Sequence, residues 1–234
     1  MEPDDARNLA HIEIFEDLED AERRRLEARC RWQRYKSGEH ILAHGSDSRE
    51  VFFVAQGAVN VVNVSLSGRE VAFATIGPGD CFGELSAIDG KPRSAGVVAS
   101  EDTLLAILPS EAFVELLQNR AGVTYRLLQR LTQMVRAGDL RIMELSTLAA
   151  SHRVFAELLR MAEPDAAVPG RWVVRQLPPL REIASRVSTT RETVARALGQ
   201  LYRGGLVRRR GRVLYLSDRD KLEAYVDARR TEAP

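Results

Sequence analysis

A change in the spacing of apolar residues near position 110 constrains this chain more than any other feature of its sequence. Between residues 36 and 108, short runs of β-branched and aromatic residues alternate with glycine-containing turns; the runs cover residues 51–54, 59–64, 70–76 and 97–108. Strands of about 5–8 residues with regular turn signals are typical of an all-β barrel or roll. Because no helix-length segment separates these runs, the sequence excludes a parallel sheet with crossover helices.

Helical patterns flank this β-rich segment. Residues 5–36 are predicted to form short helices, since the charged stretch 21–34 lacks glycine and proline. After residue 111, apolar residues recur every three or four positions along one long helix, interrupted only at Gly138; they are Leu128, Leu131, Val135, Ile142 and Leu145. Such a heptad seam predicts pairing with a second helix and therefore a homodimer. The alternative is an amphipathic helix that packs on its own β domain.

The last third of the chain is predicted to form helices and a basic hairpin. The helices cover residues 151–162, 180–187, 190–203 and 219–229, and strand-like runs at 206–209 and 212–216 meet at Gly211. Two closely spaced helices followed by a basic hairpin are the layout of a winged helix-turn-helix. We therefore predict an α+β fold: a β-roll with N-terminal helices over 1–117, a dimerisation helix and hinge over 118–149, and a winged helix-turn-helix over 150–234.

Composition indicates a globular protein of a reducing compartment. Hydrophobic residues make up 44% and charged residues 29% of the 234 residues, a balance typical of globular domains. The cysteines Cys30 and Cys81 are too few for a disulfide framework, a four-cysteine zinc site or an iron–sulfur cluster. No apolar stretch approaches the ~18–20 residues that span a bilayer, and the acidic N-terminus lacks a signal-peptide core. We expect a soluble, cytoplasmic protein with no membrane partner.

The net charge of +1 conceals opposite charges in the two parts of the chain. Residues 150–234 contain 17 Lys and Arg against 10 Asp and Glu, whereas residues 1–149 contain 17 against 23. A basic C-terminal part joined to an acidic N-terminal part predicts that only the C-terminal part meets a polyanion such as DNA.

Residues 82–95 concentrate groups that suit an anionic ligand. Gly83 permits close backbone approach, and residues 84–87 could form one helical turn whose free N–H groups bind an anion. Arg93 supplies a planar donor fork for a phosphate, while the acceptor-only carboxylate of Glu84 suits a sugar hydroxyl. This combination predicts a nucleotide of low charge. The alternative is that Glu84 and Arg93 only pair with each other across a loop.

Residues 189–196 open the longer C-terminal helix with side chains that suit the DNA major groove. Arg191, Glu192 and Arg196 are expected to be exposed; arginine donates to guanine O6 and N7, and glutamate accepts from cytosine N4. A local interpretation competes with this one. Thr189 and Glu192 fit a capping box, and Glu192 and Arg196 fit a salt bridge within the helix.

The sequence Phe-Gly-Glu-Leu at 82–85, followed by Pro-Arg-Ser-Ala at 92–95, closely resembles the phosphate-binding cassette of cyclic-nucleotide-binding domains. The resemblance implies that Glu84 binds the ribose 2′-OH and that Arg93 binds the cyclic phosphate. It also implies that the other cassette residues shape the pocket or donate to the ligand; these are Gly83, Leu85, Ser86, Ser94 and Ala95.

The order of a β-roll, a heptad helix and a helix carrying Arg-Glu-Thr-Val-x-Arg resembles the cyclic-AMP receptor protein/FNR family of bacterial transcription regulators. In its cyclic-AMP receptor branch, the residues matching Arg191, Glu192 and Arg196 read a TGTGA half-site in palindromic DNA. The resemblance implies contacts to the DNA backbone from Thr190, Thr193 and the wing residue Arg210, although the arginine run 208–212 could be only a solvated hairpin. Leu180 stands where the family has a phosphate-contacting arginine, and Arg181 is expected to take over that contact. RNA polymerase is a further implied partner, and cyclic AMP the implied allosteric ligand.

One departure from the family pattern concerns the base of the ligand. Receptors that prefer cyclic AMP usually carry Thr-Ser or Thr-Asn on the dimer helix, where this chain has Gly138 and Asp139. The Asp139 carboxylate could accept from the adenine amino group or from N1–H and the N2 amino group of guanine, and Ser94 could also face guanine. Cyclic GMP is therefore a hypothesis alongside cyclic AMP.

Other functions compete with this interpretation. The chain could be a regulator of the same family that needs no ligand or senses a different one. It could also be a cyclic-nucleotide-binding regulatory subunit without DNA activity, against which the Arg-Glu-Thr-Val-x-Arg helix argues. An enzyme is disfavoured, because the sequence shows no nucleophile–base pair and no metal cluster.

Overall fold

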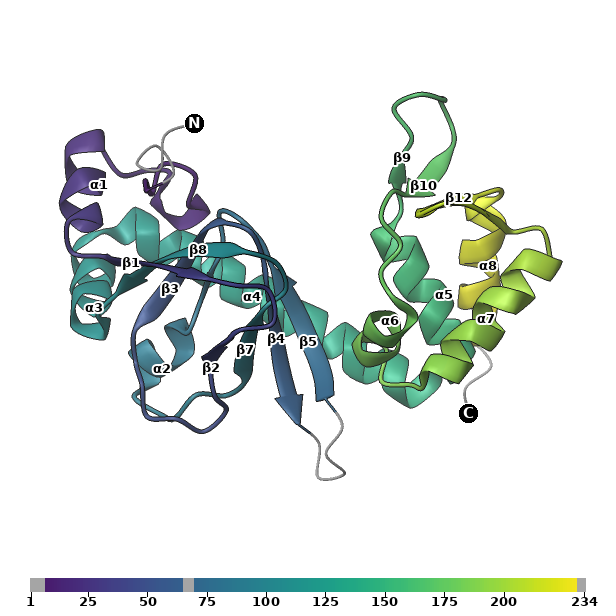
Figure 1. Cartoon of the computed structure of the whole chain (residues 1–234), viewed down its shortest axis with the longest axis horizontal. Helices are drawn as coiled ribbons and strands as arrows, with labels where there is room; N and C mark the ends of the chain where they lie inside the picture. The colour runs from purple at the N-terminus through teal and green to yellow at the C-terminus, as the bar shows by residue number, and fades with distance from the viewer. Residues whose placement is uncertain (1–6, 65–69, 231–234) are drawn as a thin grey trace. The chain divides into compact units, whose positions relative to one another are not determined.

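The computed structural model describes residues 7–64 and 70–230. The chain divides into two compact units, Met1–Met134 and Val135–Pro234 (Figure 1). Helix α4 (Ala121–Thr147) contributes residues to both units. Along the described residues, no helix combines the length and the apolar character needed to cross a bilayer.

The first unit is built on two four-stranded antiparallel sheets, which confirms the predicted β-roll. One sheet has the order β1-β8-β3-β6, formed by Arg31–Tyr35, Thr103–Leu108, Val51–Gln56 and Cys81–Phe82. The other has the order β2-β7-β4-β5, formed by His40–Leu42, Gly96–Ala99, Val59–Val64 and Glu70–Ile76. Every described strand pair in both sheets is antiparallel.

Two predictions for this unit were wrong in detail. Residues 31–34 lie in strand β1 rather than in a helix, because every residue of Arg31–Tyr35 pairs with a residue of β8, from Ile107 back to Thr103. The single predicted run 97–108 is two strands, β7 and β8, separated by a turn at residues 100–102. In both cases pairing with a distant strand overrides the local pattern.

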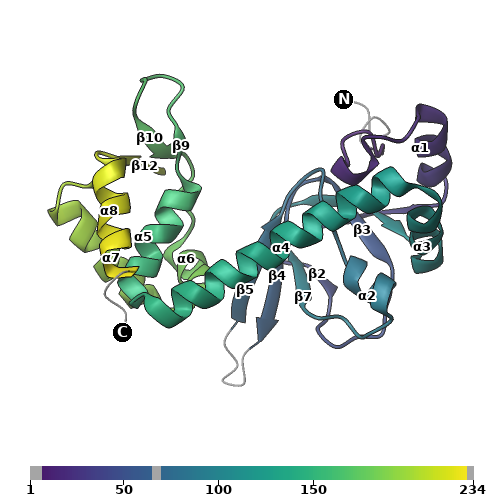
Figure 2. The same ribbon diagram turned by 180° about the vertical axis from the view of Figure 1, so that it is seen from behind.

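Aromatic and aliphatic side chains join the sheets to the surrounding helices. Phe53 of β3 lies with its ring centroid 4.8 Å from Phe15, in the 3-10 helix η1 (Glu13–Phe15), and 6.3 Å from Phe113, in α3 (Ser110–Asn119). Val123 and Leu127 of α4 belong to the same buried cluster. Figure 2 shows α4 crossing this unit, so the first half of the helix is fixed to the roll. Helix α1 (Asp20–Glu27) contributes Leu26 to this cluster.

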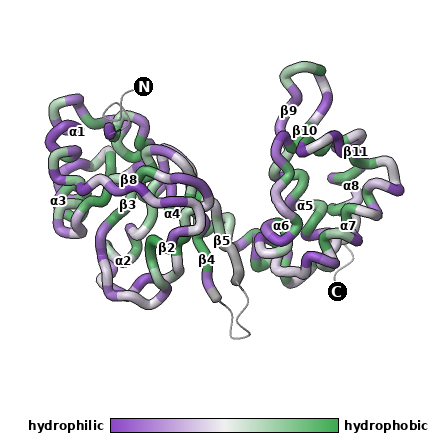
Figure 3. Tube along the Cα trace, viewed as in Figure 1, coloured by the Kyte–Doolittle hydropathy of each residue, from purple (hydrophilic) through white to green (hydrophobic). Residues whose placement is uncertain are grey.

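The second unit is a winged helix-turn-helix, as predicted. Its helices are α5 (Ala150–Met161), α6 (Leu180–Arg186), α7 (Arg191–Arg203) and α8 (Arg219–Arg230). Its sheet has the order β11-β12-β10-β9, formed by Val207–Arg210, Val213–Leu216, Trp172–Val174 and Glu163–Pro164. The strands β9 and β10 were not foreseen in the sequence. Hydrophobic and hydrophilic residues are mixed along α5 and α7 (Figure 3), as amphipathic helices require.

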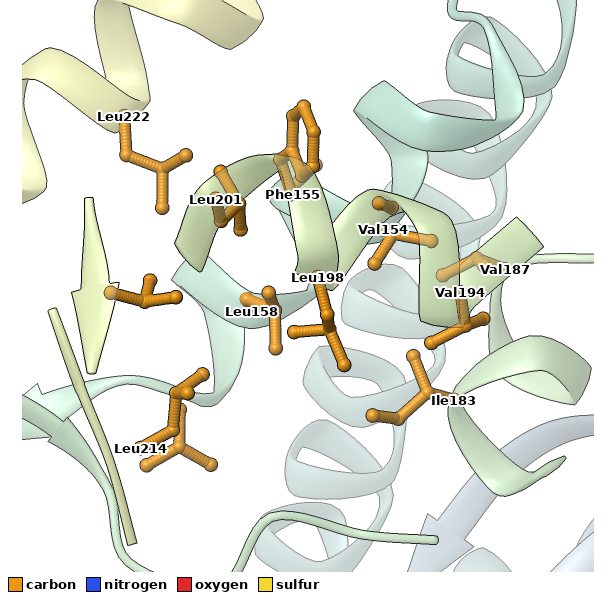
Figure 4. Close-up of a cluster of buried hydrophobic side chains, with 14 of the residues drawn as sticks. Val154, Phe155, Leu158, Ile183, Val187, Val194, Leu198, Leu201, Leu214 and Leu222 are labelled. Carbon is orange, nitrogen blue, oxygen red and sulfur yellow. The ribbon is translucent and has the colours of Figure 1, made fainter. Parts of the chain in front are cut away.

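A single buried cluster holds the second unit together. Phe155 and Leu158 of α5 and Ile183 of α6 meet Leu198 of α7 and Leu222 of α8 in this cluster (Figure 4). Each of these side chains is at most 4% exposed. The apolar face predicted for residues 190–203 is confirmed, since Val194, Ala197, Leu198 and Leu201 are all buried.

Helix α4 keeps an apolar stripe on its surface. The predicted seam residues Leu128, Val135 and Ile142 are 55%, 63% and 65% exposed, and Leu145 is exposed as well. Leu131 differs, because it packs in part against the core of the roll. An apolar stripe that residues 7–64 and 70–230 leave uncovered favours a partner helix over packing on the chain's own β domain.

Candidate functional site

A cavity opens in the first unit. All seven cassette residues predicted from the sequence line it: Gly83, Glu84, Leu85, Ser86, Arg93, Ser94 and Ala95. The rest of the described lining is mainly apolar and includes Leu42, Val61, Ile76 and Val97 from the strands. Helix α4 adds Arg130 and Met134, which sequence reasoning did not identify.

Gly83 permits the geometry of this cassette. It precedes helix α2 (Glu84–Asp89), which confirms the predicted helical turn, and it adopts a left-handed backbone with φ of +82°. A Cβ atom at this position would lie 2.5 Å from Nη1 of Arg93 and 2.9 Å from the carbonyl oxygen of Glu50. Both the backbone conformation and the approach of Arg93 therefore require glycine here.

Arg93 is held rigidly at the wall of the cavity. Its side chain is 2% exposed, and every guanidinium nitrogen donates to a protein acceptor. Nε donates to Ser48 Oγ at 2.9 Å, Nη1 to the Gly83 carbonyl at 2.8 Å, and Nη2 to the Glu50 carbonyl at 2.8 Å. Further N–H groups remain on the two terminal nitrogens, so a ligand would meet a cation that is already oriented.

The acidic partner of Arg93 is Glu50, whose carboxylate lies 3.7 Å from Nη2. The alternative prediction of a simple Glu84–Arg93 ion pair is therefore not favoured by the geometry. Ser48 and Glu50 lie more than 40 positions before Arg93 in the sequence, which explains why the sequence pattern did not reveal them.

Glu84 is buried in the same cavity with 4% of its surface exposed. Burial raises the pKa of its carboxyl group, while its own backbone N–H and the charge of Arg93 act in the opposite direction. A buried carboxylate is costly unless a donor satisfies it. The hydroxyl of a ligand would supply such a donor at this position.

The helix-turn-helix presents the predicted DNA-contacting residues on its surface. Thr190 caps α7, because its side chain accepts from the Thr193 backbone N–H at 3.2 Å. The predicted capping box of Thr189 and Glu192 is wrong, since the helix begins one residue later and Thr189 is buried. Arg191, Glu192 and Arg196 are exposed in the first part of α7, and Arg181 is exposed at the start of α6.

The wing is an antiparallel hairpin of β11 and β12. Its turn contains Gly211, whose φ is +63°, and Arg209 donates from Nε to the Gly211 carbonyl at 2.8 Å. Arg208, Arg210 and Arg212 are exposed beside it. The wing therefore carries a dense positive charge.

Arg153 of α5 connects the end of α4 to the turn of the helix-turn-helix, and sequence reasoning missed it. It donates to the carbonyl oxygens of Leu148 at 2.8 Å, Val187 at 3.0 Å and Ser188 at 3.1 Å. One planar group therefore links the residue that follows α4 to the turn before α7.

Ser188 is the non-glycine residue with a positive φ, +51°, in the described chain. We expect Ser188→Gly to raise the free energy of unfolding by about 0.5–1 kcal/mol, because glycine relieves the left-handed strain. Thermal unfolding of the full chain checks this. The matched control is Ser146→Gly inside α4, which should lower the free energy of unfolding by about 0.5 kcal/mol. A change of the same sign in both variants would contradict the prediction.

Gly138 and Asp139 lie in the part of α4 that belongs to the second unit. A Cβ atom on Gly138 would meet no described atom of the chain within 4 Å. Packing within the described chain therefore does not account for a glycine inside this helix.

Comparison with known proteins places both units in known families. Residues 32–120 match the cyclic nucleotide-binding domain family, and residues 152–225 match the Crp-like helix-turn-helix domain family. The chain is 35% identical over 174 residues to a cyclic AMP receptor protein of Thermus thermophilus, covering 74% of this chain and 78% of the relative. It is 26% identical over 216 residues to a CRP-like cAMP-activated global transcriptional regulator of Mycobacterium tuberculosis, covering 92% and 96%.

A solved structure agrees with these matches. The crystal structure of a CRP/FNR family transcriptional regulator from Thermus thermophilus superimposes with a TM-score of 0.64 and 27% identity, over 85% of this chain and 100% of that one. The Mycobacterium relative and the solved Thermus structure are both named as transcriptional regulators. One chain thus combines a cyclic nucleotide-binding domain with a Crp-like helix-turn-helix domain, and it belongs to the CRP/FNR family.

Proposed function

We propose that this protein is a cyclic-nucleotide-dependent regulator of transcription that binds palindromic DNA as a homodimer in the cytoplasm. The observation that carries the proposal is the pair of buried, oppositely charged groups, Glu84 and Arg93, in a single largely apolar cavity. A cyclic nucleotide offers one phosphate negative charge and one free ribose hydroxyl. It therefore matches one fixed cation and one buried acceptor.

In the proposed complex Arg93 donates to the cyclic phosphate and Glu84 accepts from the ribose 2′-OH. Gly83 and Ser86 lie at the start of α2, where backbone N–H groups favour a phosphate. Ser94 can donate through its hydroxyl, while Leu85 and Ala95 add apolar surface to the cavity wall. Cyclic AMP and cyclic GMP both fit this description.

In the proposed dimer the exposed seam of α4 packs against the same seam of a second copy. The two-fold axis would then present two α7 helices to successive major grooves, about 34 Å apart. Gly138 and Asp139 are the proposed contacts of α4 to the ligand or to the partner helix. Ligand binding would change how the two α4 helices pack and thereby move the two helix-turn-helix units. The size of this shift is set by how much more tightly the ligand binds the DNA-competent state than the other state.

The proposed DNA interface is the exposed start of α7. Arg191, Glu192 and Arg196 would read bases of a TGTGA half-site. Backbone phosphates would be contacted by Thr190, Thr193, Arg181 and Arg210. RNA polymerase is the proposed protein partner of the DNA-bound dimer.

Fluorescence anisotropy of a labelled TGTGA-N6-TCACA duplex tests the proposal, with and without each cyclic nucleotide. We expect tight binding that depends on a nucleotide and weakens steeply with salt, because arginines displace counterions from DNA. Tight binding without nucleotide would identify a ligand-independent regulator. Nucleotide binding without any DNA affinity would identify a regulatory subunit instead.

Nucleotide affinity is expected to fall as the pH is lowered through the raised pKa of Glu84. The protonated acid is no longer a pure acceptor for the ribose hydroxyl. Among its neighbours Arg93 stays charged, and burial keeps the Cys81 thiol neutral by raising its pKa. The stability of the ligand-free protein should change in the opposite direction and rise as the pH falls, because protonation of Glu84 relieves the cost of burying its charge.

Calorimetric titration between about pH 7 and pH 5 measures this effect. Glu84→Gln should bind nucleotide more weakly and with a flatter pH profile than the wild type. Parallel profiles for the two proteins would show that another group causes the pH dependence.

A further inference from the structure

Arg130 of α4 brings a second guanidinium to the cavity. One terminal nitrogen pairs with the Asp80 carboxylate, and Nη2 donates to the Cys81 carbonyl at 2.6 Å. The Nε atom is buried and has no hydrogen-bond partner among the described residues. The Arg130 side chain is 18% exposed and lines the cavity, and each terminal nitrogen keeps one further N–H, so two donors remain for acceptors on a ligand.

The other polar side chains of the described cavity wall are already assigned to parts of the ligand other than the base. In the proposed complex Arg93, Glu84 and the cassette serines serve the phosphate and the ribose. The wall further along is apolar, with side chains such as Leu42, Val61 and Ile76 that suit the flat face of a base. Arg130 is then the charged group left for the edge of the base.

Arginine discriminates between the two purines, because it has donors and no acceptor. Guanine offers two acceptors on one edge, O6 and N7, whereas adenine offers N7 beside an amino donor. Met134 follows Arg130 by one helical turn and also lines the cavity. Its flexible thioether side chain can pack against a purine ring without adding a donor or a strong acceptor.

We propose that Arg130 is a specificity-determining residue that donates to O6 and N7 of a guanine-type base, so that cyclic GMP binds more tightly than cyclic AMP. This inference rests on the proposed function, since it assumes a cyclic nucleotide in the cavity. Asp80 and the Cys81 carbonyl act as positioning groups that orient the Arg130 guanidinium. Cyclic AMP still binds through N7, with one hydrogen bond fewer.

Calorimetric titration of the full chain with four cyclic nucleotides tests the assignment. We expect cyclic GMP and cyclic IMP, which share O6 and N7, to bind similarly and about tenfold more tightly than cyclic AMP. The 7-deaza analogue of cyclic GMP should bind more weakly than cyclic GMP. Cyclic IMP keeps O6 and N7 but lacks the N2 amino group. If Arg130 selects the base, cyclic IMP binds as tightly as cyclic GMP, whereas a contact from Asp139 to the N2 amino group would make it bind more weakly.

A variant of Arg130 and a matched control complete the test. Arg130→Gln should remove the preference for cyclic GMP, because the glutamine amide offers an acceptor as well as a donor and no longer selects two acceptors on one edge. The control is Arg126→Gln, one turn earlier on α4, where the arginine pairs with Asp17 and Glu16 and does not line the cavity. It should leave the ratio of affinities unchanged.

The outcomes distinguish this inference from the proposed function. A wild-type preference for cyclic AMP, or an unchanged ratio in a folded Arg130→Gln protein, overturns the role of Arg130 and leaves nucleotide binding intact. Absence of binding by all four nucleotides overturns the proposed function itself.

Discussion

Replacing Arg93 by lysine is expected to weaken cyclic-nucleotide binding by at least about 30-fold and to abolish the effect of the nucleotide on DNA binding. The lysine keeps the positive charge but cannot donate to Ser48, Gly83 and Glu50 while it faces the ligand. Two functions depend on the planar fork: it orients the cation, and it offers its remaining N–H groups to the phosphate. Truncating one partner of a buried, hydrogen-bonded charge pair costs about 2–5 kcal/mol, and the expected loss of about 30-fold stands at the lower end of that range because the lysine retains the charge.

The matched control for this prediction is Arg49→Lys. Arg49 is an exposed arginine in the segment that supplies Ser48 and Glu50, so its replacement should leave nucleotide affinity unchanged. Calorimetry measures the affinity, and thermal unfolding verifies that the first unit remains folded. Nucleotide affinity in the Arg93→Lys protein within about threefold of the wild type would show that the phosphate is bound elsewhere.

Replacing Arg191 by alanine is expected to reduce specific DNA affinity strongly and to relax the preference for guanine at one position of each half-site. A bidentate arginine–guanine contact contributes about 1–3 kcal/mol of discrimination. The proposed dimer makes this contact twice, so the expected loss is about 2–6 kcal/mol if the half-sites are independent. Binding to unrelated DNA should change less, because it depends mainly on phosphate contacts.

The control variant lies on the same helix. Arg203 is exposed near the C-terminal end of α7 and donates to the Gly199 carbonyl at 3.2 Å, away from the residues that would enter the groove. Arg203→Ala should affect specific and non-specific DNA alike. Anisotropy with a set of singly substituted half-sites gives the measurement, and an unchanged base preference in Arg191→Ala would contradict the assignment.

Local patterns were sufficient to predict most elements of the fold. The strands at 59–64 and 70–76 and the helices of the second unit follow from the spacing of apolar residues and from turn glycines. Strand β1 was not predicted, because Arg-Trp-Gln-Arg-Tyr is charged and only partly buried, and it becomes a strand by pairing with β8. The strands β9 and β10 contain two and three residues, too few to leave a periodic signal.

The residues of the candidate site also fall into a group that the sequence could predict and a group that it could not. The cassette is contiguous in sequence, so its residues and the turn at Gly83 could be predicted from the order of residue types. Arg130 and the partners of Arg93 come from distant segments, and only the fold brings them to the cavity. Arg153 likewise contacts residues 34 and 35 positions away. No spacing rule in the sequence reports such contacts.

Reciprocal coupling between nucleotide and DNA tests the central claim, that the cavity of the first unit controls the DNA affinity of the second. Calorimetry of cyclic GMP and cyclic AMP binding, with and without saturating palindromic DNA, gives the factor by which DNA tightens nucleotide binding. Anisotropy gives the factor by which nucleotide tightens DNA binding. We predict that the two factors are equal and well above one, as linkage requires for a single allosteric transition. A nucleotide affinity that is the same with and without DNA would contradict the account.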